Sequence, residues 1–413
     1  MRAELSHLTG DGWLLFLTRG TRLFAYGALS VVLVLYLTSR GLTASQIGVL
    51  LTLTLVGDTA VSLWLTTRAD RFGRRRTLVL GAVLMAAAGL AFAGTRNLAL
   101  LILAATIGVV SPSGNEVGPF LSIEQAALSQ VIPHDMRTAV FAWYTLVGSF
   151  ATALGTLCGG LLSNELGNAR VVVLLYAGLG ALLAALFTRV SPGVEVGVSS
   201  PRISWGLGGS RSVVLKLSAL FGLDAFGGGF VVQSFAAYWF YLRFGVNPAT
   251  LGAIFFGANL LAGTSALLAS RLARRFGLVR TMVFTHLPSN ILLLLVPLMP
   301  TLPLAVLVLF ARFSISQMDV PTRQSYIMAV VRPEERSAAA GITGVARTTG
   351  AAIAPVFAGL LFARPALISL PFFIAGTLKA VYDVLLYLGF VAVRLPEEPK
   401  EPEPGAGNVA RPR

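Results

Sequence analysis

Residues 68–77 read RADRFGRRRT, and residues 272–281, 204 positions later, read LARRFGLVRT. Each stretch lies between two apolar runs. The same offset pairs Gly41 with Gly245 and Gly48 with Gly252. A second match, at an offset of 199, sets VIPHDMRTA (131–139) against VVRPEERSA (330–338). Matches that keep one order at nearly one offset indicate a chain made of two duplicated halves.

The composition predicts a membrane protein. Of the 413 residues, 55% are hydrophobic and only 12% are charged, whereas a soluble domain is about 25% charged. A membrane-spanning helix needs about 20 apolar residues. We therefore predict an all-α membrane protein with twelve transmembrane helices in two pseudo-symmetric six-helix bundles. The expected helices are 12–38, 44–67, 77–95, 98–130, 138–163, 169–189, 212–243, 247–271, 280–298, 301–330, 337–363 and 368–393.

Three of these apolar runs are too long for one straight span. The fourth contains Pro112, Gly114 and Pro119, the seventh contains Gly227 to Gly229, and the tenth contains Pro321. Proline and glycine interrupt helices. We expect helices 4, 7 and 10 to be kinked or broken.

The helix count and the repeat predict the domain organisation. Residues 1–190 form the first bundle, 191–211 a Gly/Ser/Pro-rich cytoplasmic linker, and 212–395 the second bundle. The tail 396–413 is rich in Pro and Glu, a composition typical of disorder.

The net charge of +14 is a topology signal here. Most Lys and Arg fall in loops that share one side, and the other loops hold five: Arg40, Arg96, Arg170, Arg243 and Arg364. Since basic loops stay in the cytoplasm, we expect a multi-pass inner (plasma) membrane protein with both termini cytoplasmic. We expect no nucleic-acid partner. The lone Cys158 excludes an internal disulfide and a multi-thiolate metal site.

The stretch ADRFGRRR (69–76) resembles the signature that follows helix 2 in the major facilitator superfamily. The usual leading glycine is replaced by Thr66 or Thr67, and the second copy has Arg274 in place of the aspartate. The resemblance covers the whole chain and implies a transporter. It also implies a conformational latch between the bundles, and the alternative is a plain basic anchor. The latch residues would be Asp70, Arg71, Gly73, Arg74 and Arg75.

A weaker resemblance concerns helix 5. ATALGTLCGG (151–160) is similar to the helix 5 motif of drug–proton antiporters, with Gly155, Gly159 and Gly160 in place but Thr156 where that motif has proline. Helix 11 carries Pro355 within GAAIAPVFAG (350–359). The resemblance implies efflux, and the alternative is ordinary packing of small residues.

Twelve ionisable residues fall inside the predicted spans, where charges are costly and usually functional. Their balance predicts mutual pairing. Asp319 and Arg323, spaced i,i+4, form either a structural ion pair or a gate near the cytoplasmic end of the cavity, and we expect Lys379 to pair locally with Asp383. In the alternative pairings, Asp58 or Asp224 pairs with Lys379 or with Arg347. Arg19 and Arg22 neutralise Glu124 or bind an anionic substrate. The acidic members are Asp58, Glu116, Glu124, Asp224, Asp319 and Asp383, and the basic members are Arg19, Arg22, Arg312, Arg323, Arg347 and Lys379.

Glu116 is the first candidate for proton coupling, because it lies at mid-depth in an interrupted helix; the alternative is a structural partner of Arg19, Arg22 or Arg347. Asp58 and Asp224 come next. Tyr238, Trp239 and Tyr241 are expected in an interfacial aromatic belt. The remaining residues expected at the proton or substrate cavity are Asn115, Gln233, Asp319, Arg323, Gln324, Arg19, Arg22 and Arg347.

The function favoured by these features is secondary transport of a small molecule by alternating access, coupled to protons and directed outward. Proton-coupled uptake, or uniport of a small polar or anionic metabolite, is the alternative. A non-transporting receptor or scaffold is a third class. The absence of H-E-x-x-H, G-x-S-x-G and G-x-x-x-x-G-K-[S/T] argues against an enzyme. We expect no cofactor, no metal and a functional monomer.

The latch hypothesis predicts that Asp70→Asn slows transport without preventing membrane insertion. The neutral amide keeps the size of the side chain but loses its charge-assisted hydrogen bonds. Flux is measured alongside the amount of protein in the membrane fraction. Wild-type flux in this variant would reduce the motif to a topology signal.

Overall fold

The structure is a computed structural model that describes residues 8–132, 137–192, 195, 209–332 and 335–391. Within these ranges the side chains of residues 67, 68, 70, 71, 131, 137–139, 270 and 337 are not described. The predicted tail and most of the predicted linker lie outside the described residues, so the domain boundaries stay a prediction.

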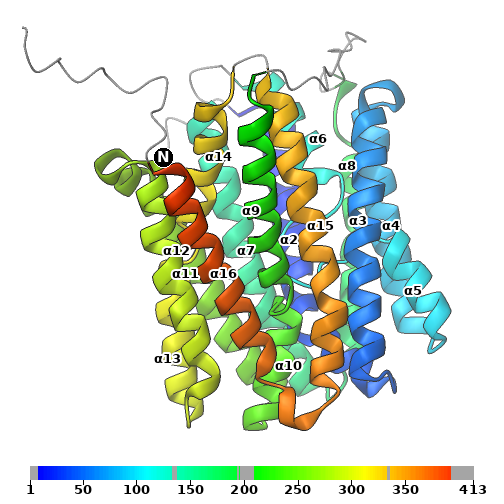
Figure 1. Cartoon of the computed structure of the whole chain (residues 1–413). Coiled ribbons are helices and arrows are strands. Elements are labelled where there is room, and N and C mark those ends of the chain that lie inside the picture. The colour runs from blue at the N-terminus through cyan, green and yellow to red at the C-terminus, as the bar shows by residue number, and fades with distance from the viewer. Residues whose placement is uncertain (1–7, 133–136, 193–194, 196–208, 333–334, 392–413) are drawn as a thin grey trace, which may run out of the picture.

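The described chain crosses the molecule twelve times, all in helices (Figure 1). The predicted twelve-helix fold is confirmed. The first six crossings are α2 (Gly10–Ser39), α3 (Ala44–Phe72), α4 (Arg74–Gly94), α5 (Leu98–Ile107) with α6 (Phe120–Val131), α7 (Arg137–Glu165) and α8 (Arg170–Phe187). The second six are α9 (Arg211–Gly229) with α10 (Gln233–Phe244), α11 (Pro248–Phe276), α12 (Leu278–Leu295), α13 (Leu302–Phe313) with α14 (Asp319–Val330), α15 (Arg336–Phe362) and α16 (Leu370–Phe390). There are two 3₁₀ turns: η3 (Val296–Leu298) follows α12, and η5 (Pro365–Leu367) precedes α16.

Helices 4, 7 and 10 are broken, as the sequence predicts. The fourth is interrupted between Ile107 and Phe120, and the seventh between Gly229 and Gln233. The break in the tenth lies at residues 314–318, just before Pro321. Proline fits the first turn of α14, where its missing N–H is not needed, so Pro321 begins a helix and does not interrupt one.

The duplication is visible in the backbone at the offset of 204. Gly73 and Gly277 both adopt a positive φ, of 94° and 84°, in the turns that follow α3 and α11. A positive φ strains any residue with a Cβ, which explains the glycine at both places. At the other end of the same two helices, Thr43 and Asn247 are N-caps whose side chains accept from Gln46 N and Thr250 N.

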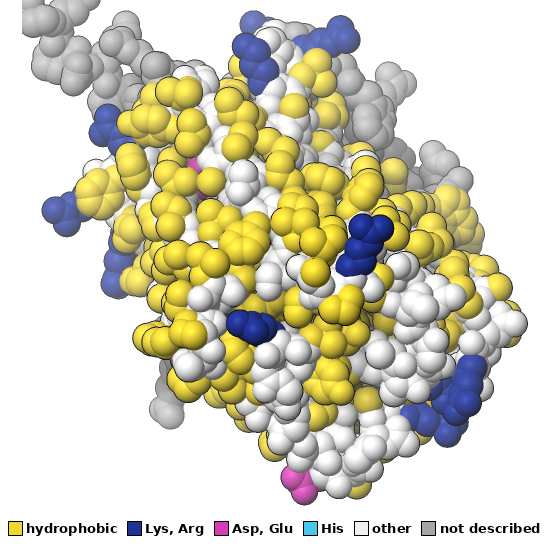
Figure 2. Space-filling view, turned by 60° about the horizontal axis from the view of Figure 1, so that its bottom comes forward, with side chains coloured by type: hydrophobic (Ala, Val, Ile, Leu, Met, Phe, Trp, Pro, Cys, Tyr) yellow, Lys and Arg dark blue, Asp and Glu magenta, His cyan; other side chains and the backbone are white. Residues whose placement is uncertain are grey.

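Both ends of the described chain lie at one face, the top of Figure 1, which we call the terminal face. The turns from α2 to α3 and from α15 to α16 lie at the opposite far face. Large hydrophobic side chains cover the flank of the molecule (Figure 2). Leu307 and Leu388 are 63% and 73% exposed, and such residues suit contact with lipid tails.

The two halves meet backbone to backbone near the far face. A Cβ on Gly48 of α3 would lie 2.9 Å from Gly359 Cα of α15, and one on Gly252 of α11 would lie 3.0 Å from Gly160 Cα of α7. Each of these glycines lies within about one and a half turns of its helix end at the far face. Because glycine has no Cβ, the two helices can approach this closely at these positions.

This contact predicts the effect of adding one methyl group. In Gly252→Ala the new Cβ meets Thr156 O at 2.7 Å, and overpacking of this kind costs about 1–3 kcal/mol. Gly178→Ala is the matched control, because a Cβ there meets nothing within 4 Å. We expect a lower thermal unfolding midpoint for Gly252→Ala than for Gly178→Ala in detergent. Equal midpoints would contradict the close approach.

Candidate substrate and coupling site

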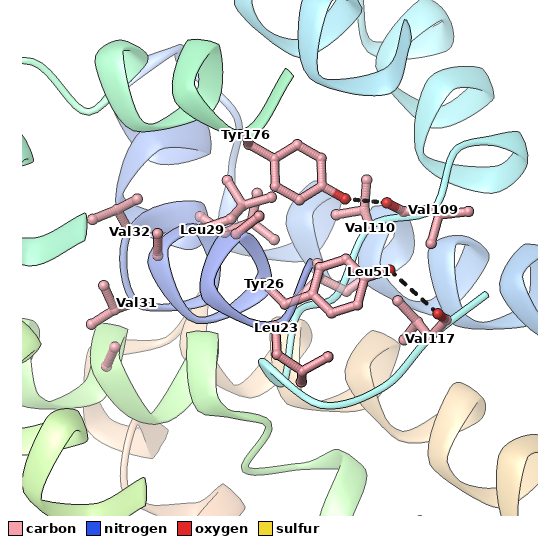
Figure 3. Close-up of a cluster of buried hydrophobic side chains, with 14 of the residues drawn as sticks. Leu23, Tyr26, Leu29, Val31, Val32, Leu51, Val109, Val110, Val117 and Tyr176 are labelled. Atoms are coloured by element: carbon pink, nitrogen blue, oxygen red, sulfur yellow. Dashed lines mark hydrogen bonds between the residues drawn. The ribbon is translucent and has the colours of Figure 1, made fainter. Parts of the chain in front are cut away.

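The break in helix 4 is a segment, residues 108–119, whose backbone is bonded by side chains of neighbouring helices. Tyr176 of α8 donates to Val109 O, and Tyr26 of α2 donates to Val117 O at 3.3 Å (Figure 3). Thr152 of α7 donates to Gly114 O at 3.3 Å. Since unbonded backbone groups cost several kcal/mol inside a membrane, these partners allow a non-helical segment at this depth.

The same segment is bonded to the second half of the chain. Ser234, at the start of α10, donates its N–H and its hydroxyl to Pro112 O, at 3.1 and 2.5 Å. The preceding Gln233 donates to Ser30 Oγ of α2 at 2.6 Å and accepts from Asn259 Nδ2 of α11 at 3.0 Å. The broken ends of helices 4 and 7 are therefore joined across the two halves.

Two arginines and two glutamates form a buried network in the first half. Arg22 of α2 donates two hydrogen bonds of 2.7 Å to Glu124 of α6, and both side chains are fully buried. Glu116 pairs with Arg19 and, at 3.1 Å, with Arg22. Tyr144 also donates to Glu124. Glu116, the first candidate for proton coupling, is thus held by two guanidinium groups.

Asp58 of α3 has a different environment. Its Oδ1 accepts from Gly118 N, in the helix 4 break, at 2.6 Å and from Ser62 Oγ at 3.4 Å. Among the described residues, no Lys or Arg forms an ion pair with it. A carboxylate inside a membrane without a basic partner is costly, whereas a protonated carboxyl group is tolerated.

The second half holds a second network. Asp224 of α9 accepts from Lys379 Nζ of α16 at 2.5 Å and from Arg323 of α14 at 3.3 Å. Arg323 also pairs with Asp319 at 3.0 Å, which is the predicted i,i+4 pair. The predicted local pair of Lys379 with Asp383 is wrong, and the alternative partner, Asp224, is the one that Lys379 reaches.

The partner of Asp383 is a histidine that the sequence analysis missed. His286 Nδ1 lies 2.8 Å from Asp383 Oδ1, and Asn290 donates to Asp383 Oδ2 at 2.8 Å. His286 Nε2 lies 3.6 Å from Asp224 Oδ1. The run THLPSN (285–290) carried a signal, since His286 and Asn290 are polar, spaced i,i+4 and set within an apolar helix.

The two networks join equivalent helices with the charges reversed. In the first half the arginine lies on helix 1 (Arg22) and the acid on helix 4 (Glu124). In the second half the acid lies on helix 7 (Asp224) and the arginine on helix 10 (Arg323). Each pair fixes a broken helix to the first helix of its own half, so each half is locked internally.

Arg312 and Arg347 differ from the other buried arginines. Both are partly exposed, and within the described part of the chain neither forms an ion pair or a side-chain hydrogen bond. The Nε atom of each is buried and unbonded. The contrast with Arg22 and Arg323, which are buried and doubly paired, sets these two apart.

The remaining predicted cavity residues lie apart from the networks. Asn115, in the helix 4 break, and Gln324 of α14 are both exposed side chains. The predicted aromatic belt is wrong for Trp239, which is fully buried and donates to Ser369 Oγ at 3.1 Å. Tyr241 is 43% exposed, whereas Tyr238 is buried.

The side chains of Asp70 and Arg71 lie outside the described part of the chain. The turn that follows them is bonded by Glu195, from the segment after α8. Its carboxylate accepts from Arg74 N at 2.7 Å and from Arg75 N at 3.1 Å, at the start of α4. A carboxylate at a helix N-terminus is favourable. Glu195 lies in the predicted linker, where no pattern of residues pointed to this contact.

The predicted packing residues divide between two interfaces. A Cβ on Gly155 or Gly159 would overlap the backbone of α2 in the same half, whereas Gly160 touches α11 of the other half. Pro355 lies inside α15, and the next residue, Val356, donates its N–H to Thr52 Oγ1 of α3 at 2.9 Å.

Comparison with known proteins agrees with this architecture. The sequence model described as Major Facilitator Superfamily matches residues 15–286 and 217–412. An uncharacterized membrane protein of Saccharomyces cerevisiae is 31% identical, over 90% of this chain and 92% of its own length.

Solved structures share the fold at low identity. A mutant of the nucleoside transporter NupG is 12% identical with a TM-score of 0.76, over 92% of this chain and all of that one. A bacterial homologue of the iron transporter ferroportin, in an inward-facing state, is 13% identical with a TM-score of 0.70, over 92% of this chain and 98% of that one.

The buried pair of Arg22 and Glu124 predicts a large stability effect. Glu124→Gln removes from the buried Arg22 the carboxylate that accepts its two 2.7 Å hydrogen bonds and leaves it only the longer pair with Glu116, and breaking a buried ion pair costs about 3–5 kcal/mol. Glu165→Gln, an exposed carboxylate at the end of α7, is the control and should change stability little. The double variant Arg22→Met/Glu124→Leu should regain part of the loss. Unfolding midpoints in detergent measure all three, and equal midpoints for Glu124→Gln and Glu165→Gln would refute the pairing.

Proposed function

Because this chain belongs to the major facilitator superfamily, we propose that it carries a small solute across a membrane by alternating access and exports it in exchange for protons. The family and the fold make it a membrane transporter, not an enzyme. Beyond membership of this family, we propose export as the direction of transport, coupling to protons and a functional monomer.

The observation that supports alternating access is the placement of the contacts between the halves. Gly48 meets Gly359 and Gly160 meets Gly252 near the far face. The bond from Ser234 to Pro112 joins the halves at their broken helices. With the contact between Gly263 and Ser149, halfway along α11 and α7, these contacts join the halves from the far face to mid-depth. Rocking of two bundles about such contacts, around a central site, is how transporters built from repeats move solutes.

The orientation comes from the basic loops. If the positive-inside rule holds for this chain, its terminal face is cytoplasmic and its far face is external. The contacts near the far face would then seal the external side. A transporter in this state loads from the cytoplasm, which supports export as the direction.

Asp58 is our candidate for the proton-carrying group. Glu116 is neutralised by Arg19 and Arg22, whereas Asp58 has only Gly118 N and Ser62 Oγ. Loss or gain of a proton at Asp58 alters a bond to the helix 4 break, and that break is bonded to helix 7 of the other half. Proton binding at Asp58 is thereby linked to the contact between the halves. Glu116 is the second candidate for the proton-carrying group.

Proton-coupled uptake, or uniport of an anionic metabolite, is the second candidate function. It is favoured by Arg312 and Arg347, which have no acidic partner in the described part of the chain. Arg347 also lies close in register to Asp58. The pair Thr52 and Val356 sets the register of α3 against the antiparallel α15, and Asp58 then falls within about one turn of Arg347.

Internal pH in proteoliposomes tests the function. Vesicles loaded with a panel of nucleosides, sugars, organic cations and organic anions are diluted, and a trapped dye reports the pH. For an exporter, exit of the transported solute should acidify the interior. Asp58→Asn should abolish this response but keep solute counterflow, because the amide cannot exchange a proton. Glu165→Gln should behave as wild type.

Two results would contradict these assignments. A wild-type response of Asp58→Asn would place proton coupling on another group, with Glu116 next. Alkalinisation as the solute leaves would mean that solute and proton move together, which is symport.

A further inference from the structure

We propose that His286 is a second proton-binding site, separate from Asp58, in which one proton on the imidazole ring bridges α12 to α9 and α16. The ring lies between Asp224 of α9 and Asp383 of α16. This inference goes beyond the proposed function, because the proton is held within the second half and is not the one that is exchanged for the solute.

The first observation is that each ring nitrogen faces a carboxylate oxygen. His286 Nδ1 lies 2.8 Å from Asp383 Oδ1, and Nε2 lies 3.6 Å from Asp224 Oδ1. A neutral imidazole has one N–H group, whereas an imidazolium has two. In the neutral ring, one nitrogen would therefore turn its lone pair toward a carboxylate. The charged ring presents an N–H group to both carboxylates, so this geometry favours the extra proton.

The second observation is the burial of this contact. His286 and Asp224 are each 5% exposed, and Asp383 is fully buried. Asn290 donates to Asp383 Oδ2 at 2.8 Å, so both oxygens of this carboxylate have a partner. Among the described residues, Asp383 forms no ion pair with a lysine or an arginine. A buried carboxylate needs a paired charge or a proton, and the charged ring of His286 supplies it.

The third observation is the charge balance of the network that includes the ring. Besides His286, it joins three acidic and two basic side chains: Asp224, Asp319, Asp383, Arg323 and Lys379. A charged ring makes the acidic and basic groups of this network equal in number. Loss of its proton leaves one carboxylate without a basic group, which is costly inside a membrane.

The other ionisable groups on α12 and on the helices that pack against it are not acidic. Tyr382 of α16 meets the ring edge to face, with the ring centroids 5.7 Å apart. The remaining groups on α11, α12, α13, α14 and α16 are arginines and tyrosines, namely Arg271, Arg274, Arg275, Arg280, Arg312, Tyr326 and Tyr387. A tyrosine is ordinarily neutral near pH 7. Asp224 and Asp383 are therefore the groups that favour the charged ring.

A proton needs no cavity, and the site lies toward one face of the molecule. His286 and Asp383 are each about two turns from the terminal-face end of their helices. The network of the first half relies on Arg19 and Arg22, and arginine stays charged at any working pH. Histidine gains and loses its proton near neutral pH. The ion pairs of the second half therefore respond to pH in a range where those of the first half do not.

Nitrogen-15 NMR of the imidazole ring tests this inference, because charged and neutral rings give different spectra. The protein is labelled with nitrogen-15 histidine, carries His7→Gln and His134→Gln so that His286 is its one histidine, and is held in lipid nanodiscs. We expect the charged ring at about pH 6 and the neutral ring at about pH 9, on either side of the ordinary pKa of histidine.

In Asp383→Asn the ratio of charged to neutral ring at about pH 6 should fall at least about tenfold, because an acidic partner this close favours the charged form by at least that factor. Asp224→Asn is an independent variant with the same expected direction. Glu165→Gln, an exposed carboxylate at the end of α7, is the control and should keep the ratio of the parent protein.

Gel filtration shows whether each variant is folded, and the parent protein alone can refute the site. The proposal is overturned if its ring keeps one charge state from about pH 5 to about pH 9, a range that spans the ordinary pKa of histidine. It is also overturned if both asparagine variants keep the ratio of the parent protein. Because the ring is observed without a solute, neither result depends on whether the protein exports, imports or exchanges protons.

Discussion

The bonding of the helix 4 break is the constraint on which the rest of the structure depends. A bilayer offers no water to an unwound backbone, so a break at this depth must be bonded by protein. Side chains from α2, α7 and α8 bond its carbonyl groups, and Asp58 of α3 accepts from Gly118 N. The break is thereby a fixed junction of four helices. Because Ser234 bonds Pro112 as well, this junction also reaches the other half.

The charged networks and the small residues have separate roles around that junction. The reversed pairs, Arg22 with Glu124 and Asp224 with Arg323, hold each half together. Breaking such buried ion pairs would cost much free energy, so these pairs suit bundles of helices that move as rigid bodies. Among the described residues, the contacts between the halves are neutral hydrogen bonds and glycine contacts, which cost less free energy to break and reform. This division of strong bonds within halves and weaker bonds between them fits alternating access.

Local pattern predicted the fold and the breaks, whereas most side-chain partners required the tertiary structure. Apolar length gave the twelve spans, and Asp319 with Arg323 followed from i,i+4 spacing. The same spacing failed for Lys379, because its long side chain reaches Asp224 on another helix. The rotation of each helix about its axis and the identity of the helices beside it decide such pairs. Neither can be deduced from the residue spacing of one sequence. His286 and Asn290 did carry a local signal, as polar residues spaced i,i+4 in an apolar helix, but that spacing does not identify Asp383 as their partner.

Bonds from the start of α10 to the helix 4 break and to α2 hold the halves together at their broken helices. Spin labels at Arg96→Cys and Thr301→Cys, one in the far-face turns of each half, report this contact in a Cys158→Ser background. Their distance distribution is measured by double electron–electron resonance in lipid nanodiscs. The parent protein should show a single distance population, and a new, longer population should appear when Gln233→Ala and Ser234→Ala remove the side-chain bonds. An unchanged distribution in the double variant would contradict it.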